Sequence, residues 1–379
     1  MRIAIGAVVR TLGGPATYAS ELVAALAARR TPGWEYVVIT DGPEAFAGVD
    51  VELMRAPLPS PYAQVLWDHV AVPAALRRAR ADLYHGTKNT LPLWQPCPAV
   101  VTVHDLAVYR HPESFAAVQR WHLRTHVPHA MRTARAVITV SQHAAADLRA
   151  EFPAAAAKVR PIANGVSARF RPPTDPQSLA AFRVRYGLGA GPLVAYLGTL
   201  QPRKNVELLA AAFVRVRERV PDAELVLAGR MRPGYEPVLP TDGVRRIGAL
   251  AAAELPLFYG VASVLVSPSL YEGFGLTLLE AMACGCPVIA LARSAVPEVV
   301  GDAGLLLDTV DESALVDALV RVLREPGCAD ELRARGLARA ATFSWTRAAA
   351  ATETVYREVM QPVETPPGNP DGAIRRAAS

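Results

Sequence analysis

The chain has 379 residues, which is enough for two domains that each bury a full hydrophobic core. Apolar residues make up 51% of the chain, charged residues make up 20%, and the formal net charge is +5. This composition predicts a soluble globular protein. The sequence has no block of like charges and no basic stripe with interleaved aromatics, which argues against a nucleic-acid partner.

Cysteine usage and apolar runs predict where the protein works. The four cysteines have neither metal-ligand spacing nor a disulfide pattern, so we expect free thiols in a reducing cytosol. The first apolar run, residues 3–9, is too short for a signal peptide, and no apolar segment is long enough to span a bilayer. We therefore predict a cytoplasmic protein that makes at most peripheral contact with the inner face of the membrane.

The first half of the chain alternates strands with helices. Residues 2–9 predict a buried strand, Gly13 and Gly14 a loop, and residues 16–28 a helix with apolar positions at helical spacing. Further strands are predicted at residues 36–40, 82–85, 99–103, 136–140 and 159–163. This alternation is typical of a parallel, doubly wound sheet, which binds ligands at the carboxyl ends of its strands.

All eight histidines lie between His69 and His143, in this first half. His104 and Asp105 directly follow the strand predicted at residues 99–103, so they stand at the edge of the sheet where ligands bind. For a lone histidine at a strand end, the simplest interpretation is a hydrogen bond to a neighbouring backbone carbonyl. Lys88 follows another strand, and we expect a surface-loop lysine there rather than a group that binds an anionic acceptor.

A basic helical region spans residues 120–132 and contains Arg120, His122, Arg124, His126, His129 and Arg132. Three interpretations stay open for it. The region is a solvated helix face, or it holds an acidic or polar acceptor, or it lies near lipid head groups.

The second half opens with a connection and then repeats the alternation. Residues 171–192 are rich in proline and glycine and contain one predicted helix, which indicates an interdomain connection. Strands follow at residues 193–197, 224–228, 244–247, 264–267 and 287–290. A last helix ends near residue 360, and the segment 362–379, rich in proline, glycine and alanine, predicts disorder.

The segment 267–290 is the most informative stretch of the chain. A buried strand leads into a turn that contains Gly273 and Gly275, and an amphipathic helix and a second buried strand follow. A strand, a glycine-rich turn and a helix N-terminus together present backbone N–H groups to an anion. Glu272 falls in the turn and Glu280 in the second helical turn, so they can bind different parts of one ligand. The alternative is that Glu272 caps the helix and Glu280 lies on a solvated face.

Lys204 also points to an anionic ligand. The chain contains 37 arginines and only three lysines, so a lysine after the strand predicted at residues 193–197 indicates a task for a compact ammonium group. Neutralising a phosphate is such a task.

Several of these motifs together resemble one enzyme family. The Glu-x7-Glu pattern from Glu272 to Glu280 resembles the signature of the retaining glycosyltransferases of family 4, which have the GT-B fold. The Thr-Val-His-Asp-Leu sequence around His104 resembles the mannosyl- and rhamnosyltransferase-like branch, and the Asn-Gly-Val turn at residues 164–166 matches a family turn. Thr11 and Leu12 stand where glycogen and starch synthases have the start of Lys-x-Gly-Gly, which counts against that branch.

The resemblance implies an α/β architecture of the GT-B type. Two Rossmann-like, doubly wound parallel-sheet domains would face a central cleft. We expect an acceptor-binding domain at residues 1–175 and a donor-binding domain at residues 176–345. A C-terminal helix at about residues 346–361 would pack back on the first domain, ahead of the tail at residues 362–379.

The resemblance also implies roles for twelve residues. Three kinds of role are implied: catalytic for His104, Asp105 and Glu272; donor diphosphate binding for Arg203, Lys204, Gly13 and Gly14; and binding of the donor sugar or ribose for Gly273, Phe274, Gly275, Leu276 and Glu280.

The implied activity is the transfer of a hexose, with retention, from a nucleotide-diphosphate sugar to a hydroxyl of a glycan, lipid-linked or small-molecule acceptor. GDP-mannose is the first choice of donor. The sequence contains no Asp-x-Asp, so we expect no metal and no cofactor, with fixed positive groups stabilising the diphosphate instead. Two alternatives stay open: a nucleotide-sugar epimerase or sugar-phosphate synthase of the same fold, and a non-catalytic protein that binds sugar nucleotides.

Overall fold

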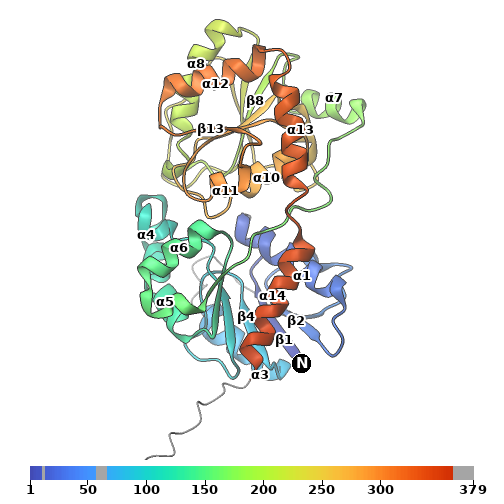
Figure 1. The fold of residues 1–379 in the computed structure, drawn as a ribbon, viewed down its shortest axis with the longest axis vertical. Helices are drawn as coiled ribbons and strands as arrows, with labels where there is room; N and C mark the ends of the chain where they lie inside the picture. The colour runs from blue at the N-terminus through green and yellow to red at the C-terminus, as the bar shows by residue number, and fades with distance from the viewer. Residues whose placement is uncertain (11–12, 57–65, 362–379) are drawn as a thin grey trace, which may run out of the picture.

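The computed structural model describes residues 1–10, 13–56 and 66–361, and in it the chain forms two lobes that lie end to end (Figure 1). Each lobe is built around one parallel β-sheet. The predicted disorder at residues 362–379 lies outside the described residues, and so do Thr11 and Leu12.

The described part of the first lobe contains a seven-stranded sheet in the order β3-β2-β1-β4-β5-β6-β7. Every pairing in it is parallel. The strands are β1 (Arg2–Ala7), β2 (Glu35–Thr40), β3 (Glu52–Arg55), β4 (Leu83–Gly86), β5 (Ala99–Thr102), β6 (Ala136–Thr139) and β7 (Val159–Pro161).

The described part of the second lobe contains a six-stranded parallel sheet in the order β10-β9-β8-β11-β12-β13. The strands are β8 (Leu193–Leu197), β9 (Glu224–Ala228), β10 (Val244–Gly248), β11 (Val264–Ser267), β12 (Val288–Leu291) and β13 (Leu305–Leu307). Both sheets confirm the predicted doubly wound parallel architecture. The domain boundaries at residues 175 and 345 stay predictions.

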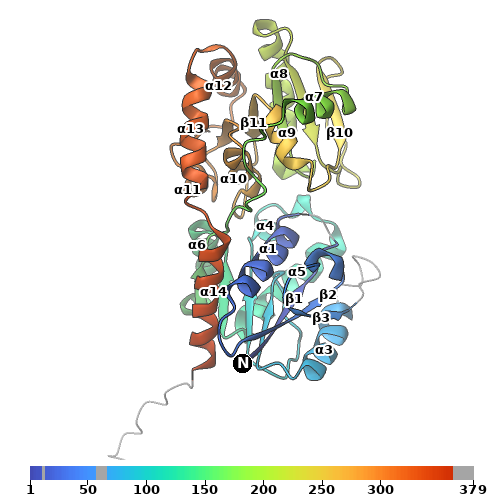
Figure 2. The same cartoon turned by 90° about the vertical axis from the view of Figure 1, so that its right-hand side faces the viewer.

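Helices cover both faces of each sheet (Figures 1 and 2). Around the first sheet lie α1 (Gly14–Arg29), α3 (Val72–Ala79), α4 (Ala107–Arg110), α5 (Ala117–Thr133), α6 (Gln142–Glu151) and α14 (Trp345–Met360). The second lobe contributes α7 (Pro176–Arg185), α8 (Val206–Arg219), α9 (Leu255–Val261), α10 (Leu276–Ala283), α11 (Val296–Val300), α12 (Glu312–Arg324) and α13 (Cys328–Ala340). Short helical turns complete the list: η1 (Pro43–Phe46), η3 (Trp67–Ala71), η4 (Pro112–Ser114), η5 (Pro153–Lys158) and η6 (Pro202–Lys204).

Most of the strands predicted from the sequence are buried, and the two that were missed lie at the edges of their sheets. β1, β5 and β11 are almost wholly buried and mainly apolar, as expected for a parallel sheet covered on both faces. β10 is mostly exposed and was nevertheless predicted. β3 has the sequence Glu-Leu-Met-Arg, which carries neither the apolar run nor the alternation by which a strand is recognised, and β13 is a run of only three leucines.

Two chain segments run next to each other where the lobes meet. Val166 forms an isolated parallel bridge with Ser344, and a Cβ atom on Gly165 would lie 2.0 Å from the backbone nitrogen of Trp345. Only glycine permits that approach, which explains the Asn-Gly-Val turn. From Trp345, α14 runs back along the first lobe beside α1 (Figures 1 and 2).

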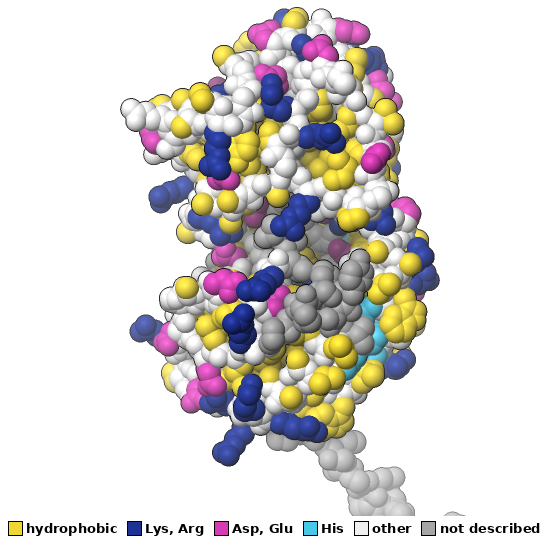
Figure 3. All heavy atoms as spheres, turned by 180° about the vertical axis from the view of Figure 1, so that it is seen from behind, with side chains coloured by type: hydrophobic (Ala, Val, Ile, Leu, Met, Phe, Trp, Pro, Cys, Tyr) yellow, Lys and Arg dark blue, Asp and Glu magenta, His cyan; other side chains and the backbone are white. Residues whose placement is uncertain are grey.

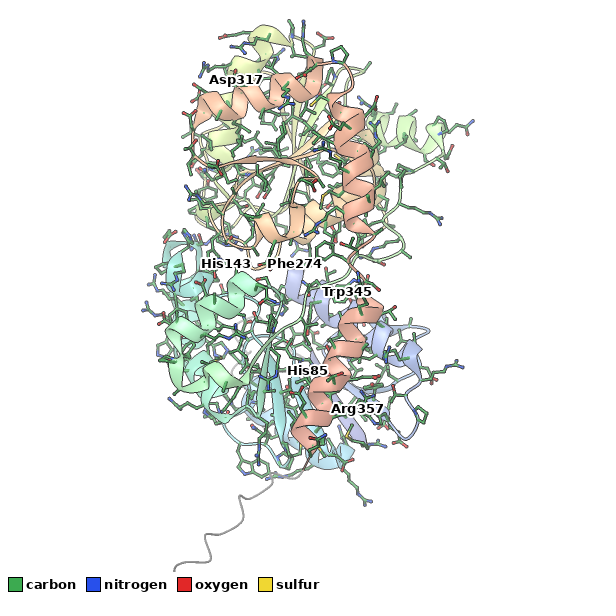
Figure 4. All side chains as sticks on the ribbon, in the orientation of Figure 1. His85, His143, Phe274, Asp317, Trp345 and Arg357 are labelled. Atoms are coloured by element: carbon green, nitrogen blue, oxygen red, sulfur yellow. The ribbon has the colours of Figure 1, made fainter. Side chains whose placement is uncertain are left out.

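A buried polar network holds α14 on the first lobe. Glu353 of α14 is fully buried and accepts hydrogen bonds from Thr31 Oγ1 at 2.5 Å and from the Tyr36 hydroxyl at 3.2 Å. Arg29 of α1 lies 3.1 Å from the same carboxylate. His85 lies under the helix, 2.6 Å from the Tyr356 hydroxyl, and burial lowers its pKa to about 3 (Figure 4). These contacts make α14 a part of the first lobe.

Candidate active site at the boundary between the lobes

The site begins with two loops of the second lobe that leave neighbouring strands at their carboxyl ends. The turn η6 follows β8, and residues 268–275 follow β11, its neighbour in the sheet. Leu270 donates its N–H to the carbonyl of Arg203 at 2.9 Å, and Arg203 Nη1 donates to the carbonyl of Tyr271 at 2.8 Å. These bonds fix the two loops against each other and bring Arg203 and Lys204 beside Glu272.

Glu272 and the two bases form a buried charged group. Glu272 forms an ion pair with Lys204 through one oxygen, and its other oxygen lies 3.9 Å from Arg203 Nη1. Burial raises the pKa of Glu272, but the two cations outweigh burial and hold the pKa below its usual value. Burial lowers the pKa of Lys204, and Glu272 opposes that change. The charges of these three side chains alone sum to +1, and the carboxylate of Asp105 in the first lobe also acts on Lys204.

The helix α10 starts next to this charged group. Gly275 precedes it with a φ of 107°, in the left-handed region that favours glycine, so the chain can turn from Glu272 into the helix. The N–H groups of the first turn and the helix dipole make this end positive. The expected amphipathic helix is wrong, because residues 278–283 are all buried and α10 is a core helix.

Glu280 lies in the second turn of α10, as predicted, and is only 7% exposed, so the alternative of a solvated face is wrong. Tyr259 of α9 donates its hydroxyl to Glu280 Oε2 at 2.9 Å. Burial raises the pKa of Glu280 to about 7, against the opposing effects of the Tyr259 hydrogen bond and of Arg169. A carboxyl close to its midpoint at neutral pH can release its proton when hydroxyl donors of a ligand arrive.

His104 faces the same boundary from the first lobe, just after β5. Its Nε2 lies 2.8 Å from the carbonyl oxygen of Thr87, which can only accept, so Nε2 carries the proton and Nδ1 of the neutral ring is an acceptor. Burial lowers the pKa of His104, against the opposing effects of the Thr87 carbonyl and of Asp105. The simplest prediction, a bond to a backbone carbonyl, is therefore confirmed. That bond also fixes the ring, which leaves Nδ1 for other chemistry.

Gly273 brings the two lobes into contact at this point. A Cβ atom there would lie 2.6 Å from the carbonyl oxygen of His104 and 2.9 Å from Cβ of Asp105, so only glycine fits. Asp105 itself accepts a hydrogen bond from the Ala107 N–H at 2.9 Å. The negative charge of Asp105 also acts to raise the pKa of Lys204, against the effect of burial. The predicted residues His104, Asp105, Glu272 and Lys204 thus gather around one glycine contact.

The remaining predicted residues lie at the rim of this group or in the core. A Cβ atom on Gly14, at the start of α1, would lie 3.9 Å from Leu276, so the N-termini of α1 and α10 are neighbours. Gly13 caps α1 with a φ of 138°. Phe274 packs its ring on Phe343 at a centroid distance of 5.8 Å, so its side chain belongs to the core and only its backbone is left for a ligand (Figure 4). The binding roles of these residues stay predictions.

Sequence reasoning missed the residues that join the lobes around this site. Tyr271 is 6% exposed, donates its hydroxyl to Asp147 Oδ2 at 2.7 Å and accepts the Leu106 N–H at 3.2 Å. Its ring lies between His111 and His143, at centroid distances of 5.8 Å and 5.9 Å. All four partners belong to the first lobe. The only signal in the sequence is the position of Tyr271 next to Glu272.

The N-terminus of α6 provides the second joint between the lobes. The carboxylate of Glu298, in α11, accepts the N–H groups of Gln142 at 2.9 Å and His143 at 3.0 Å. Ser141 caps α6 and donates its hydroxyl to the carbonyl of Gly273 at 2.7 Å. Figure 4 labels His143 and Phe274 at the level where the two lobes meet. Carboxylates are stabilised at helix N-termini, so the pairing favours a closed arrangement of the lobes.

The structure also bears on other expectations from the sequence. Lys88 is half-buried and burial lowers its pKa, so the expected surface-loop lysine is wrong. His122 and His126 are buried, which removes the interpretation of a solvated face for their side of α5. All four cysteines are free thiols, as predicted. In the described ranges no cluster of three or more His, Cys, Asp or Glu could hold a metal ion, and the need for a metal stays a matter for experiment.

None of the helices in the described residues is long and apolar enough to cross a membrane.

The chain matches two protein families over most of its length. Residues 12–170 match the family described as Glycosyltransferase Family 4, and residues 191–325 match Glycosyl transferases group 1. The chain is 31% identical over 295 residues to O-antigen chain mannosyltransferase B of Escherichia coli, covering 75% of this chain and 76% of that one.

Two further similarities concern a second relative and a solved structure. The GDP-mannose-dependent alpha-(1-6)-phosphatidylinositol monomannoside mannosyltransferase of Mycolicibacterium smegmatis is 36% identical over 179 residues, which cover 42% of this chain and 45% of that one. The structure of sucrose-phosphate synthase from Thermosynechococcus elongatus superimposes with a TM-score of 0.73 at 25% identity, over 94% of this chain and 98% of the other.

Proposed function

Because the chain belongs to glycosyltransferase family 4, we propose that it transfers a hexose, with retention and without a metal, from a nucleotide-diphosphate sugar to an acceptor hydroxyl. That it is a glycosyltransferase follows from the family matches and the mannosyltransferase relatives. The proposal adds the donor, the stereochemistry and the residues. GDP-mannose is the first choice of donor, since the relatives include mannosyltransferases and one that is named for its dependence on GDP-mannose.

One observation carries the proposal: the two cations Lys204 and Arg203 lie with Glu272 beside the N-terminus of α10, across Gly273 from His104. A leaving diphosphate gains negative charge as the glycosidic bond breaks. Fixed positive groups and a helix N-terminus stabilise that charge without having to reorganise. Lys204 and Arg203 are assigned to the diphosphate, Glu272 to a sugar hydroxyl and Glu280 to the ribose hydroxyls.

The proposed reaction takes place on one face of the sugar. The bond between the anomeric carbon and the diphosphate oxygen breaks, and the bond from the acceptor oxygen to the same carbon forms. The proton of the acceptor hydroxyl passes to an oxygen of the leaving phosphate, so the products are the glycoside and the nucleoside diphosphate. His104, neutral and fixed by Thr87, would accept a hydrogen bond from a hydroxyl at the reacting centre through Nδ1.

A two-step experiment tests this function. A thermal-shift panel of nucleoside diphosphates identifies the base, and turnover is then measured with the matching sugar nucleotides, with EDTA and with added Mg²⁺ or Mn²⁺. We expect GDP to give the largest shift and turnover to survive EDTA. Donor consumed in the absence of acceptor, with a new sugar nucleotide as product, would instead identify an epimerase.

The variant His104→Ala separates catalysis from binding. We expect transfer to fall by about 100-fold or more, while donor affinity stays at the wild-type value, because Lys204, Arg203 and Glu280 remain in place. Equal losses in transfer and in donor affinity would show that His104 only shapes the pocket.

A further inference from the structure

An apolar face lies on the first lobe, away from the donor groups. Six of the large hydrophobic side chains that are exposed in the described residues come from three neighbouring segments. Trp121 and Val118 belong to α5, Trp94 and Leu93 to the loop after β4, and Leu66 and Val70 to the region of η3; they are 52% to 66% exposed. We call the surface formed by residues 66–80, 92–98 and 116–135 the tryptophan face.

Contacts between side chains show that the three segments form one surface. His69 accepts the N–H of Leu93 at 3.1 Å, and its ring stacks on that of His126 at a centroid distance of 4.8 Å. His126 in turn lies 6.2 Å from the Trp121 ring. A layer of histidines therefore supports the exposed side chains from below. Figure 3 shows hydrophobic side chains gathered around the histidines on the lower lobe.

The three segments of the tryptophan face carry an excess of basic residues, although the exposed Asp82 lies near Cys97 of the face. Its three segments, all described, contain seven arginines: Arg77, Arg78, Arg80, Arg120, Arg124, Arg132 and Arg135. The one acidic residue in them, Asp68, is buried beneath the surface. Arg77 lies over the Trp94 ring at 4.4 Å, which places a guanidinium directly beside an exposed indole. Figure 3 shows Lys and Arg side chains at the edge of the hydrophobic group.

This combination fits one kind of partner. Exposed tryptophans mixed with arginines suit the boundary between the head groups and the acyl chains of a bilayer, where the indole is partly wet and the cation meets lipid phosphates. The excess of basic residues adds attraction to anionic lipids, which falls off within a Debye length. A partner protein without a strong negative charge would leave this excess positive charge uncompensated.

The inner edge of the tryptophan face reaches the active site. Asp68 accepts the Thr90 hydroxyl at 2.8 Å, and Thr90 lies in the loop after β4. Thr87 of that loop holds the His104 ring through its carbonyl oxygen at 2.8 Å. A chain of buried contacts therefore links the underside of the tryptophan face to the loop that holds His104.

We propose that the tryptophan face docks on an anionic lipid bilayer and that the acceptor is the hydroxyl-bearing head group of an amphiphile held in that bilayer. The docking stands on the surface alone, whereas the acceptor class rests on the proposed glycosyl transfer. Docking restricts the enzyme to the plane in which the acceptor diffuses.

Vesicle flotation of the full chain tests the docking without any turnover. The probes are vesicles of phosphatidylcholine alone and of phosphatidylcholine with an equal part of phosphatidylglycerol. We expect binding to the anionic vesicles only, weakened by salt. The double variant Trp94→Ser/Trp121→Ser should lose binding by about tenfold for each tryptophan. Both side chains are more than half exposed, so the fold should survive, which a thermal melt checks.

Matched variants show whether vesicle binding depends on the tryptophan face or on any exposed apolar or basic side chain. Val184→Ser and Val238→Ser remove apolar side chains that are 81% and 86% exposed on the second lobe and should bind vesicles as the wild type does. Arg78→Gln with Arg120→Gln should weaken binding to anionic vesicles, whereas Arg324→Gln on α12 should not.

Three results would overturn the proposal. One is a wild type that ignores anionic vesicles, and another is a tryptophan variant that still floats with them. The third is a lipid-free dimer, seen by analytical ultracentrifugation, that the tryptophan variant dissolves, because a second copy would then be the occupant. For the acceptor class, the deciding result is faster turnover with a water-soluble glycan than with any glycolipid embedded in vesicles. That result would refute an amphiphile as the acceptor, while the proposed glycosyl transfer would still stand. Failure of all turnover alongside normal vesicle binding would count against the proposed function instead.

Discussion

Glu272 and Glu280 are two buried carboxylates of one short segment that the structure sets to opposite protonation behaviour. Glu272 faces Lys204 and Arg203, and its pKa falls below the usual range. Glu280 faces a tyrosine hydroxyl, and its pKa rises to about 7. Burial alone raises the pKa of both, so the difference comes from the charge of the groups that each carboxylate touches.

The two carboxylates divide the proposed donor pocket into a fixed end, where the charge is set by the protein, and an adjustable end, where the charge changes with pH and ligand. At Glu272 the charges are set by an ion pair between side chains that are 13% and 15% exposed, with Arg203 beside them, so both cations are in place before any ligand arrives. At Glu280 the charge depends on pH and on whether hydroxyl donors are present. The fixed end suits a diphosphate and the adjustable end suits a diol.

Removing the cation should have the largest effect. Lys204→Met leaves Glu272 buried beside Arg203 only, and we expect the free energy of unfolding to fall by about 3 kcal/mol, because a buried charge has lost its partner. Urea denaturation at neutral pH measures the change. Donor affinity should fall in the same variant.

Two further variants show whether charge compensation is the cause. Lys204→Met combined with Glu272→Gln should recover much of the lost stability, because no unpaired charge is then buried. Lys158→Met, which removes an exposed lysine bonded to the Arg132 carbonyl, should change stability by about 0.5 kcal/mol or less. Stability losses that simply add in the double variant would mean that the pair is not coupled.

The adjustable end predicts a pH dependence of stability. The pKa of Glu280 is higher in the folded chain than the ordinary value of 4.5, so its contribution to stability is complete below pH 4.5 and is lost as the pH rises through about 7. Between pH 5 and pH 8.5 the wild type should lose about 2 to 3 kcal/mol relative to Glu280→Gln, which cannot ionise. Urea denaturation series at several pH values measure this difference.

Glu254 offers the matched control, because it also accepts a tyrosine hydroxyl, from Tyr186 at 2.9 Å, but at the surface. Its pKa is lowered, chiefly by the Ala251 N–H, so Glu254→Gln should leave the slope between pH 5 and pH 8.5 unchanged. An identical slope in the wild type and in Glu280→Gln would show that Glu280 is already ionised in the folded chain.

The sequence predicts well those features that depend on residues close together along the chain. The apolar runs predicted the buried strands of both sheets, and the glycine turn predicted the start of α10 after Glu272. The edge rule for parallel sheets also placed His104 and Lys204 correctly, since both follow strands at their carboxyl ends. Such rules need only neighbours along the chain.

What the sequence did not reveal depends on partners far away in the chain. Nothing near Tyr271 indicates that its hydroxyl meets Asp147, which is 124 residues earlier. The opposite pKa shifts of Glu272 and Glu280 likewise follow from Lys204 and Tyr259, which only the fold brings to them. The exposed side of α5 was also hidden, because its helical pattern mixes buried histidines with exposed tryptophan and arginine.

The last prediction asks how far the first lobe holds Glu272 in place. Tyr271→Phe keeps the ring between His111 and His143 but removes both hydrogen bonds of the hydroxyl, to Asp147 and Leu106. We expect turnover to fall by about tenfold, which corresponds to about 1.4 kcal/mol, with donor affinity little changed, because the bases and Glu280 belong to the second lobe alone.

A double-mutant cycle with Asp147→Asn isolates this link, since both changes act on the same 2.7 Å hydrogen bond. The two effects on turnover should overlap rather than add. Tyr186→Phe, which removes a tyrosine hydroxyl bonded to a surface carboxylate in the second lobe, should leave turnover at the wild-type level. If Tyr271→Phe instead weakened donor binding and left turnover unchanged, the charged group at Glu272 would depend on the first lobe. The contrast between the two carboxylates would then not arise within the second lobe alone.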